Sequence, residues 1–288
     1  MNNNWREKEK RAEQARIHTA QMTRYNDQTN LTIGNSKIYS PDSIIVPNIS
    51  QSNNEISVYD TDFPAAIAER KFFENEITVH DADSVSAAFY EKFYDKNSGK
   101  ICILNFASYK NPGGRFIDGS FAQEEALCHA SNLYNVLGAF GNYYEENKKN
   151  LNKGMYHNRA IYSPEVLFFG EHAKINLPTA IPSGLLMVPF DVLTCAAPNF
   201  SVAKRYGNFT KAENTLALKL RIRFILSILS ENQVNTAILG AFGCGVFAQD
   251  PYEVATIFKE ELQFIHIPRV VFAIPGGKNL EAFRKVFE

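Results

Sequence analysis

Apolar runs bounded by turn residues alternate along this chain with segments of helical periodicity. The apolar runs predict strands at 76–80, 100–106, 185–196, 236–239 and 270–274. Between them, apolar residues recur every three to four positions, which predicts helices at 84–94, 121–137, 140–150, 209–230 and 280–287. Strands that are apolar throughout and alternate with helices are typical of a mostly parallel sheet covered on both faces. The pattern therefore predicts an α/β fold.

The N-terminal part of the chain has a different pattern. Residues 4–24 are rich in charged side chains with spaced apolar positions, which predicts a surface helix that packs on the main domain or frames one wall of a cleft. Residues 25–55 predict extended segments or a hairpin, with β-like runs at 31–33 and 43–46. No linker or internal repeat follows, so we expect one domain over 1–288, with 1–55 as an accessory segment packed on it.

Shorter elements are predicted at four further places. Residues 56–59 favour a short strand and residues 63–73 a brief helix. Two apolar runs, 160–162 and 166–169, predict a hairpin around Ser163-Pro164-Glu165. Asp83-Ser84 and Asp250-Pro251 each have the residue types that begin a helix.

Composition excludes several classes of protein. The formal net charge of -1 gives no overall attraction to nucleic acid or anionic membranes. The four cysteines are scattered without CxxC spacing, which argues against a structural zinc site and a secreted disulfide scaffold. The N-terminus lacks an apolar signal core, and no run is long and apolar enough to span a membrane. We therefore expect a cytoplasmic protein that binds no metal and no membrane.

Two glycine-rich loops follow predicted strands, at 111–119 and at 240–247. Glycine allows left-handed backbone angles and lets a ligand approach the backbone N–H groups closely. Ligands of parallel sheets bind beyond the carboxyl ends of the strands, and two such loops suit a diphosphate. The second loop is neither a dinucleotide fingerprint nor a P-loop, and a tight strand-to-helix turn explains it equally well. Phe247, at its end, can close over a sugar or simply pack.

Two adjacent glutamates follow the first loop. Ser120 and Gln123 have the spacing of a capping box, so the helix is expected to begin just after Ser120. Glu124 and Glu125 then lie in its first turns and point about 100° apart, which does not suit an opposed catalytic pair. One acid with one orienting carboxylate is favoured, and a solvated helix face is the alternative. The helix N-terminus favours the ionised carboxylate, whereas burial and a bound diphosphate favour the protonated form.

Five other residues carry possible chemistry. Cys244 is interpreted as a small residue between glycines, and His129 as a core or surface residue. Asp191 and Asn199 either satisfy local backbone groups or line the cleft. Arg115 is placed to meet a phosphate or a partner's carboxylate, although a solvated loop arginine is the simpler reading.

At this point the sequence resembles a known family. The stretch LNFASYKNPGGRFIDGSFAQEEALCHASNLY is similar to the signature of bacterial-type poly(ADP-ribose) glycohydrolases, which consists of a Gly-Gly-Gly loop followed by Gln-Glu-Glu. The stretches IYSPEV, TCAAPN, ILGAFGCGVFAQDP and VFAIPG resemble the same family in the same order. The resemblance implies a macrodomain, in which a mixed sheet is flanked by helices behind an N-terminal helical extension. It also implies cleavage of the ribose–ribose O-glycosidic bond of poly(ADP-ribose), without metal or cofactor.

The resemblance implies roles for the first loop and its helix. Glu125 would be the general acid that protonates the leaving hydroxyl and then the base that activates water. Glu124 would orient the ribose hydroxyls, and Gln123 would contact the substrate or support the glutamates. Gly113 and Gly114 would line the catalytic loop near the diphosphate and the distal ribose.

The family resemblance also implies that the second loop and two asparagines contact the ligand. The diphosphate-binding loop would consist of Gly243, Cys244, Gly245, Val246 and Phe247, with the Phe247 ring against the ligand. Asn105 lies at the strand end that approaches the ligand, and Asn199 is included among the ligand-binding candidates.

Arg115 replaces the third glycine of the family's loop. Its side chain is expected to crowd the substrate, to narrow the substrate to a single ADP-ribosyl group, or to abolish turnover while binding remains. A mono-ADP-ribosyl hydrolase, a non-catalytic ADP-ribose-binding macrodomain and an enzyme acting on another nucleotide diphosphate sugar are therefore the alternatives.

Overall fold

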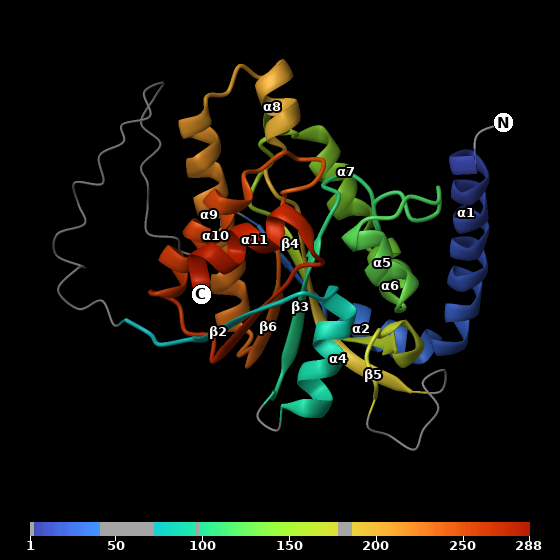
Figure 1. Cartoon of the computed structure of the whole chain (residues 1–288). Coiled ribbons are helices and arrows are strands. Elements are labelled where there is room, and N and C mark those ends of the chain that lie inside the picture. Colours follow the sequence, from blue (N-terminus) through green and yellow to red (C-terminus); the bar gives the residue numbers. More distant parts are fainter. Residues whose placement is uncertain (1–2, 41–71, 96–97, 178–185) are drawn as a thin grey trace.

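The computed structural model describes residues 3–40, 72–95, 98–177 and 186–288. Within them one seven-stranded sheet has the order β1-β4-β5-β3-β6-β7-β2 (Figure 1). Its strands are β1 (Lys37–Tyr39), β2 (Glu76–His80), β3 (Ile101–Phe106), β4 (Ala160–Phe169), β5 (Met187–Cys195), β6 (Thr236–Leu239) and β7 (Arg269–Ala273). The five strands from β5 to β2 run parallel, whereas β4 and β1 are antiparallel to their neighbours. The sheet is therefore mixed, as the family resemblance implied.

Helices cover both faces of the sheet (Figure 1). They are α1 (Asn3–Gln21), α2 (Asn26–Asn35), α4 (Ser84–Tyr94), α5 (Gln123–His129), α6 (Leu133–Gly138), α7 (Gly141–Lys149), α8 (Phe200–Tyr206), α9 (Lys211–Glu231), α10 (Pro251–Leu262) and α11 (Gly277–Phe287). Ile103 packs with the cluster that includes α4 to α7, and Leu104 packs with the cluster of α9 to α11. Successive residues of β3 thus face opposite cores, which is why this strand is apolar throughout. None of the described helices qualifies as a membrane span.

The predicted strands of the sheet and most of the predicted helices are confirmed. Asp83 begins α4 by accepting a hydrogen bond from the N–H of Ser86 at 2.9 Å. Asp250 begins α10 in the same way with Glu253, and Pro251 takes the first helical position. The helix predicted over 4–24 is also present, as α1 and a 3-10 turn at Met22–Tyr25.

The extended segment predicted at 31–33 is wrong, because these residues lie in α2. This helix places two threonines, three residues apart, against β4 and against the segment between α5 and α6. Thr32 donates its hydroxyl to the carbonyl of Glu165 at 3.1 Å, and Thr29 accepts from the side-chain amide of Asn132 at 2.9 Å. These tertiary contacts override the β propensity of the run. The strands predicted at 43–46 and 56–59, and residues 63–71 of the brief helix, lie outside the described residues.

The predicted hairpin at 160–169 is also wrong, because β4 is one continuous strand with a bulge between Ser163 and Val166. Glu165 has a positive φ of 54° at the bulge. Its N–H donates to Oδ1 of Asp191 at 2.9 Å, and the hydroxyl of Tyr162 donates to the other oxygen of that carboxylate. The turn signal in the sequence therefore marks a bulge that a buried carboxylate on β5 holds in place.

The single helix predicted over 121–137 is two helices, α5 and α6, which break at residues 130–132. Asn132 exchanges two hydrogen bonds with Leu167 of β4, at 3.2 and 2.9 Å. The N–H of Phe169 donates to the carbonyl of Ala130 at 2.9 Å. The segment between the helices thus pairs with the strand, and that pairing ends α5. The short helix α8 was not predicted.

Candidate active site

The two glycine-rich loops leave neighbouring strands at the same edge of the sheet. The first follows β3 and the second follows β6, and these strands are paired in parallel (Figure 1). Strand β5 ends beside them, and a Cβ atom added to Gly243 would lie 2.8 Å from the Cβ of Ala197, just beyond β5. The three chain segments therefore meet beyond the carboxyl ends of adjacent parallel strands, where ligands of such sheets bind.

Glu124 is buried at this edge, with 3% of its surface exposed. Its Oε2 accepts the N–H of Ser108 at 2.7 Å, and its Oε1 accepts the side-chain amide of Asn105 at 3.3 Å. Burial, together with the nearby charge of Glu125, raises the pKa of Glu124 to about 8 against the lowering effect of the Ser108 N–H. Near neutral pH the carboxyl of Glu124 therefore keeps its proton.

Glu125 is held by two backbone amides. Its Oε1 accepts the N–H of Arg115 and its Oε2 accepts the N–H of Ala122, both at 3.0 Å. Only 6% of the residue is exposed. A solvated helix face is therefore wrong for both glutamates: the two carboxyl groups are buried side by side and fixed by hydrogen bonds.

Two glycines allow the first loop to pass directly over the carboxylates. Gly113 and Gly114 have φ values of +63° and +62°. A Cβ atom on Gly114 would lie 2.7 Å from Oε1 of Glu125 and 2.8 Å from Oε2 of Glu124. A Cβ atom on Gly113 would lie 2.6 Å from a ring carbon of Tyr134. Both positions therefore exclude any larger residue, for reasons of backbone angle and of space.

Arg115 uses its backbone and its side chain in different directions. The backbone N–H holds Glu125, whereas 64% of the side chain is exposed. The guanidinium Nε lies 3.1 Å from Oδ2 of Asp118. The side chain therefore does not occupy the space above the two carboxyl groups, where the loop backbone lies.

Gln123 fixes the start of α5 to the end of β3. Its Oε1 accepts the N–H of Phe106 at 2.9 Å, and its Nε2 donates to the carbonyl of Leu104 at 2.8 Å and to the hydroxyl of Ser84 at 3.2 Å. The predicted start of the helix just after Ser120 is wrong, because the side chain of Gln123 bonds to β3 and does not cap the helix. The helix begins at Gln123, and Glu125 reaches back to the preceding N–H of Ala122.

Asn105 is completely buried at the end of β3. Its Nδ2 donates to Glu124 and to the hydroxyl of Thr194, each at 3.3 Å. Its Oδ1 has no hydrogen-bond partner among the described residues. A buried amide oxygen without a partner is costly.

The N-terminal helix braces the first loop. A Cβ atom on Gly119 would lie only 2.0 Å from the carbonyl oxygen of Lys8, so α1 rests directly on the loop. The Nε of Arg11 donates to the carbonyl of Gly119 at 2.9 Å. Farther along α1, the ring of His18 packs edge-on against Phe116 at 6.2 Å, and Phe116 packs against His129 at 4.6 Å. The helix is therefore a packing arm, and what it packs against is the loop that holds Glu125.

The second loop presents free backbone N–H groups. Those of Gly245, Val246 and Phe247 donate no hydrogen bond to any described residue. Ser201 holds the loop: its N–H donates to the carbonyl of Phe247 at 3.2 Å, and its hydroxyl oxygen lies 3.1 Å from the carbonyl oxygen of Val246. Burial raises the pKa of the Cys244 thiol to about 12, so this cysteine is no thiolate nucleophile near neutral pH.

An aromatic cluster that the sequence did not reveal lies beside this loop. Tyr109 stacks on Tyr156 at 4.2 Å with an interplanar angle of 9°, and Tyr156 meets the ring of Phe247 edge-on at 6.1 Å. Tyr109 follows the first strand of the site, whereas Tyr156 comes from a distant segment where its φ is 59°. No local pattern marks that conformation in advance.

Asn199 satisfies a local backbone group, whereas Asp191 accepts a backbone N–H from the neighbouring strand β4. Asn199 begins α8, because its Oδ1 accepts from the N–H of Val202 at 3.1 Å and from the hydroxyl of Ser201 at 2.8 Å. In the pairing of β5 with β3, Asp191 lies opposite Cys102, near the start of β3. Asp191 is therefore at the opposite end of these strands from the glutamates. The predicted alternative in which Asp191 lines the cleft is therefore wrong.

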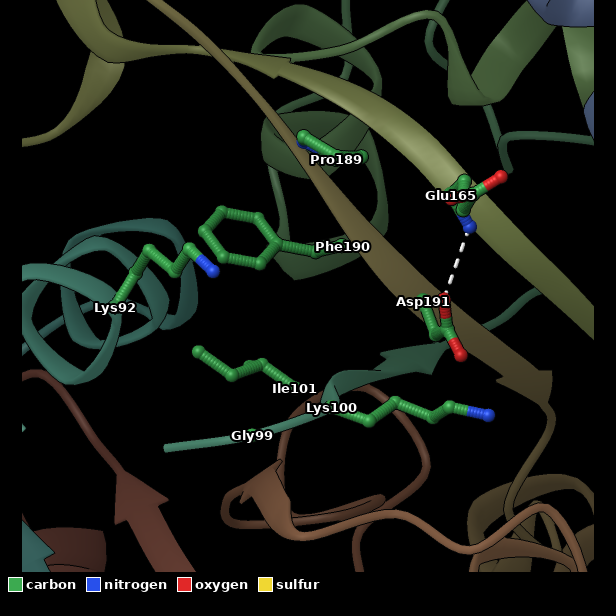
Figure 2. Close-up of a pocket in the computed structure, with 8 residues that line it drawn as sticks. All are labelled: Lys92, Gly99, Lys100, Ile101, Glu165, Pro189, Phe190 and Asp191. Atoms are coloured by element: carbon green, nitrogen blue, oxygen red, sulfur yellow. Dashed lines mark hydrogen bonds between the residues drawn. The ribbon is translucent and has the colours of Figure 1, made fainter. Parts of the chain in front are cut away.

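Asp191 lines a different cavity, of about 180 Å³, at this opposite edge (Figure 2). The other lining residues are Lys92, Gly99, Lys100, Ile101, Glu165, Pro189 and Phe190. The carboxylate of Asp191 turns to the N–H of Glu165, as the dashed line in Figure 2 shows. No group of three or more His, Cys, Asp or Glu placed to hold a metal is found in the described part of the chain.

Residues 7–171 match the family model of the microbial-type PARG catalytic domain, which is more than half of the chain. The chain belongs to this family. The matched residues include the first glycine-rich loop and both glutamates of the PARG signature. No curated protein matches the chain.

Solved structures of bacterial PARG enzymes share its fold. The poly(ADP-ribose) glycohydrolase of Thermomonospora curvata, bound to the inhibitor ADP-HPD, superposes with a TM-score of 0.74 at 23% identity, over 97% of this chain and 100% of that chain. The poly(ADP-ribose) glycohydrolase of Deinococcus radiodurans, in complex with ADP-ribose, gives a TM-score of 0.70 at 28% identity, over 90% of this chain and 97% of that chain. The predicted PARG-type fold is confirmed.

Proposed function

We propose that this chain is a poly(ADP-ribose) glycohydrolase, which releases ADP-ribose from the polymer by hydrolysing the bond between two riboses. One observation carries the proposal beyond family membership. Two adjacent carboxyl groups of α5 are buried beside the end of β3. The N–H of Arg115 in the first loop and the N–H of Ala122 at the start of α5 each hold one oxygen of Glu125 at 3.0 Å. The PARG structure from D. radiodurans holds ADP-ribose, which supports the same ligand here.

The diphosphate of the substrate would be bound by backbone N–H groups of the second loop. Three successive N–H groups, at Gly245 to Phe247, are free for phosphate oxygens. Phe247 and the stacked pair of Tyr109 and Tyr156 would pack against the ligand beside them.

The chemical step would use Glu125 twice. Its carboxyl group gives a proton to the bridging oxygen while the bond from that oxygen to the anomeric carbon breaks, and the shortened polymer leaves as an alcohol. Water then attacks the oxocarbenium-like anomeric carbon and returns a proton to Glu125. One water is consumed, one ADP-ribose is released and the enzyme is restored.

Glu124 would support this step from beside the acid. The protonated carboxyl of Glu124 can donate a hydrogen bond to a ribose hydroxyl, and its other oxygen is fixed by Ser108 at 2.7 Å. A bound diphosphate would bring negative charge close to the reacting ribose. The same charge stabilises the cationic transition state.

The test is incubation of the protein with purified poly(ADP-ribose), followed by chromatography of the nucleotides released. We expect free ADP-ribose, and a binding preference for ADP-ribose over AMP, UDP-glucose and NAD by calorimetry. A protein that binds ADP-ribose but releases none from the polymer is a binding macrodomain. Release only from mono-ADP-ribosylated protein would make it a mono-ADP-ribosyl hydrolase. The four cysteines, all unpaired, suit a reducing compartment, and we place the enzyme in the cytoplasm.

A further inference from the structure

Arg221, on α9, is a buried cation without an anionic partner. Only 2% of the residue is exposed. Its guanidinium donates to three uncharged oxygens, which are Oδ1 of Asn158 at 2.6 Å, the carbonyl of Met155 at 3.4 Å and the carbonyl of Ala196. Burial of a charge is costly unless other groups compensate it.

The cations on either side of Arg221 along α9 are different. Lys219 and Arg223 both pair with the carboxylate of Glu261, at 3.8 and 2.6 Å. Arg221 itself forms no ion pair with any carboxylate of the described residues. The helix therefore carries one buried positive charge that the free protein balances only with carbonyl and amide oxygens.

The oxygens that Arg221 binds belong to two segments that flank the second loop. One segment follows β5, where the residue after Ala196 meets Gly243 of the loop. The other segment is 155–158, which includes Tyr156, and the ring of Tyr156 meets that of Phe247 at 6.1 Å. The guanidinium thus ties together the two segments against which the second loop packs.

The second loop brings no cation of its own. Residues 240–249 contain neither lysine nor arginine. The charge that acts on the loop from its end is negative, because burial and then the carboxylate of Asp250 raise the pKa of the Cys244 thiol. The charge of Arg221 acts from the aromatic side, where it opposes the rise that burial causes in the pKa of Tyr156. Arg221 therefore supplies positive potential to a loop whose own residues supply none.

We propose that Arg221 is a positioning residue of the second loop, and that its buried charge makes the site selective for an anionic diphosphate. This inference rests on the proposed function. The planar fork of the guanidinium holds the carbonyls of Met155 and Ala196, and so fixes the aromatic ring of Tyr156 relative to the loop. The positive charge and a bound diphosphate attract each other across residues that are themselves buried, where salt and water screen little.

A purely structural arginine would need the same three hydrogen bonds but not the charge. The two roles differ in what they predict for an uncharged ligand. If Arg221 only holds the two segments in place, its loss shifts the aromatic ring and the loop, and affinity falls equally for every ligand of the site. If its charge also acts on the ligand, the loss weakens a ligand with a diphosphate more than one without.

The experiment compares two ligands of the full chain by calorimetry. The first is ADP-ribose, and the second is its analogue in which uncharged sulfonyl groups replace both phosphates. The measured quantity is the selectivity, defined as the Kd of the analogue divided by the Kd of ADP-ribose. We expect Arg221→Met, which removes the charge from a long side chain, to lower the selectivity roughly tenfold. Arg221→Lys keeps the charge, and its selectivity should stay within about threefold of wild type.

Arg223→Met is the matched control on the same helix. It breaks the pair with Glu261, so it should lower the melting temperature and leave the selectivity unchanged. Turnover of poly(ADP-ribose) gives a second readout. Arg221→Met should raise KM roughly tenfold and leave kcat within about threefold, because none of the hydrogen bonds of Arg221 goes to Glu124 or Glu125.

Two results would overturn the role of the charge and leave the proposed function intact. One is an equal rise of both Kd values in Arg221→Met, which is what a structural arginine predicts. The other is a tenfold fall of the selectivity in Arg221→Lys, and this variant decides the question if the methionine variant does not fold. If wild type does not bind ADP-ribose, the proposed function fails, and this inference fails with it.

Discussion

Gly114 lies so close to Glu125 that a Cβ atom there would stand 2.7 Å from the Oε1 of the carboxylate. The same atom would stand 2.8 Å from Oε2 of Glu124, and the φ of Gly114 is +62°. The backbone of the loop and the two carboxyl groups are therefore mutually dependent: the loop holds Glu125, and the glutamates leave no room for a side chain above them.

Gly114→Ala should lower kcat at least a hundredfold, because the loop or the two carboxyl groups must move and a small displacement is costly in catalysis. Gly138→Ala is the matched control, since nothing lies within 4 Å of its added Cβ and its φ is not positive. Initial rates on poly(ADP-ribose) and the melting temperatures of both variants make the comparison. Near wild-type activity in Gly114→Ala would mean that the loop does not position the acid.

Glu124→Gln should stabilise the fold near neutral pH while it reduces activity. The pKa of Glu124 is raised to about 8 by burial, above the ordinary 4.5 that we take for the unfolded chain. Between these values the unfolded chain loses a proton that the folded protein keeps. Wild type therefore loses stability as pH rises from 4.5 to 8, and an uncharged glutamine avoids this loss.

The gain in the free energy of unfolding that Glu124→Gln brings should be near zero at pH 4 and reach roughly 2–4 kcal/mol above pH 8. Glutamine can keep the bond from Ser108, and the unpartnered Oδ1 of Asn105 can turn to accept from its new amide. Urea unfolding at both pH values measures the difference. A variant that is less stable than wild type at pH 8 would show that Glu124 is ionised in the folded protein.

His129→Phe should make the fold more resistant to acid. Burial, followed by the charges of His18, His172 and Arg11, lowers the pKa of His129 from 6.5 to about 4. The unfolded chain therefore binds a proton between pH 6.5 and 4 that the folded protein does not, and stability present above pH 6.5 is lost as pH falls. A phenylalanine has nothing to protonate.

The melting temperature of His129→Phe, relative to wild type, should rise by a few degrees between pH 7 and pH 4.5. Because His129 packs between Phe116 and Phe121, an aromatic replacement keeps its ring contacts. If the difference between the two proteins were the same at both pH values, protonation of His129 would not be what weakens the fold in acid.

Gln123→Ala should destabilise the protein by about 2–4 kcal/mol, because it leaves the N–H of Phe106 and the carbonyl of Leu104 without their partner. Since the same bonds fix the start of α5, activity should fall with stability. Gln14→Ala, at an exposed position on α1, is the control. Thermal unfolding of the two variants decides whether Gln123 anchors the helix.

The residues that meet at this site could be singled out in the sequence because they lie in contiguous motifs. Residues 113–125 place three glycines and two glutamates at fixed offsets, and the buried strand β3 before them is a continuous apolar run. Arg115 was ambiguous in the sequence, because only the structure separates its backbone N–H, which holds Glu125, from its outward side chain.

The errors occurred where distant residues decide local conformation. Asp191 holds the bulge at Glu165, which the sequence presents as a turn, and Asn132 ends α5 by pairing with Leu167. Tyr156 reaches the site from a segment whose conformation has no local signal. Such contacts depend on strand pairing across the sheet, which a single sequence does not specify.

The most direct measurement is kcat for release of ADP-ribose from poly(ADP-ribose) by Glu125→Gln, paired with the Kd of the same variant for ADP-ribose. The account predicts that kcat falls about a thousandfold or more, while Kd stays within roughly threefold of wild type, because glutamine preserves the shape of the site but can neither give nor take the proton. Turnover by Glu125→Gln at a rate near wild type would contradict it.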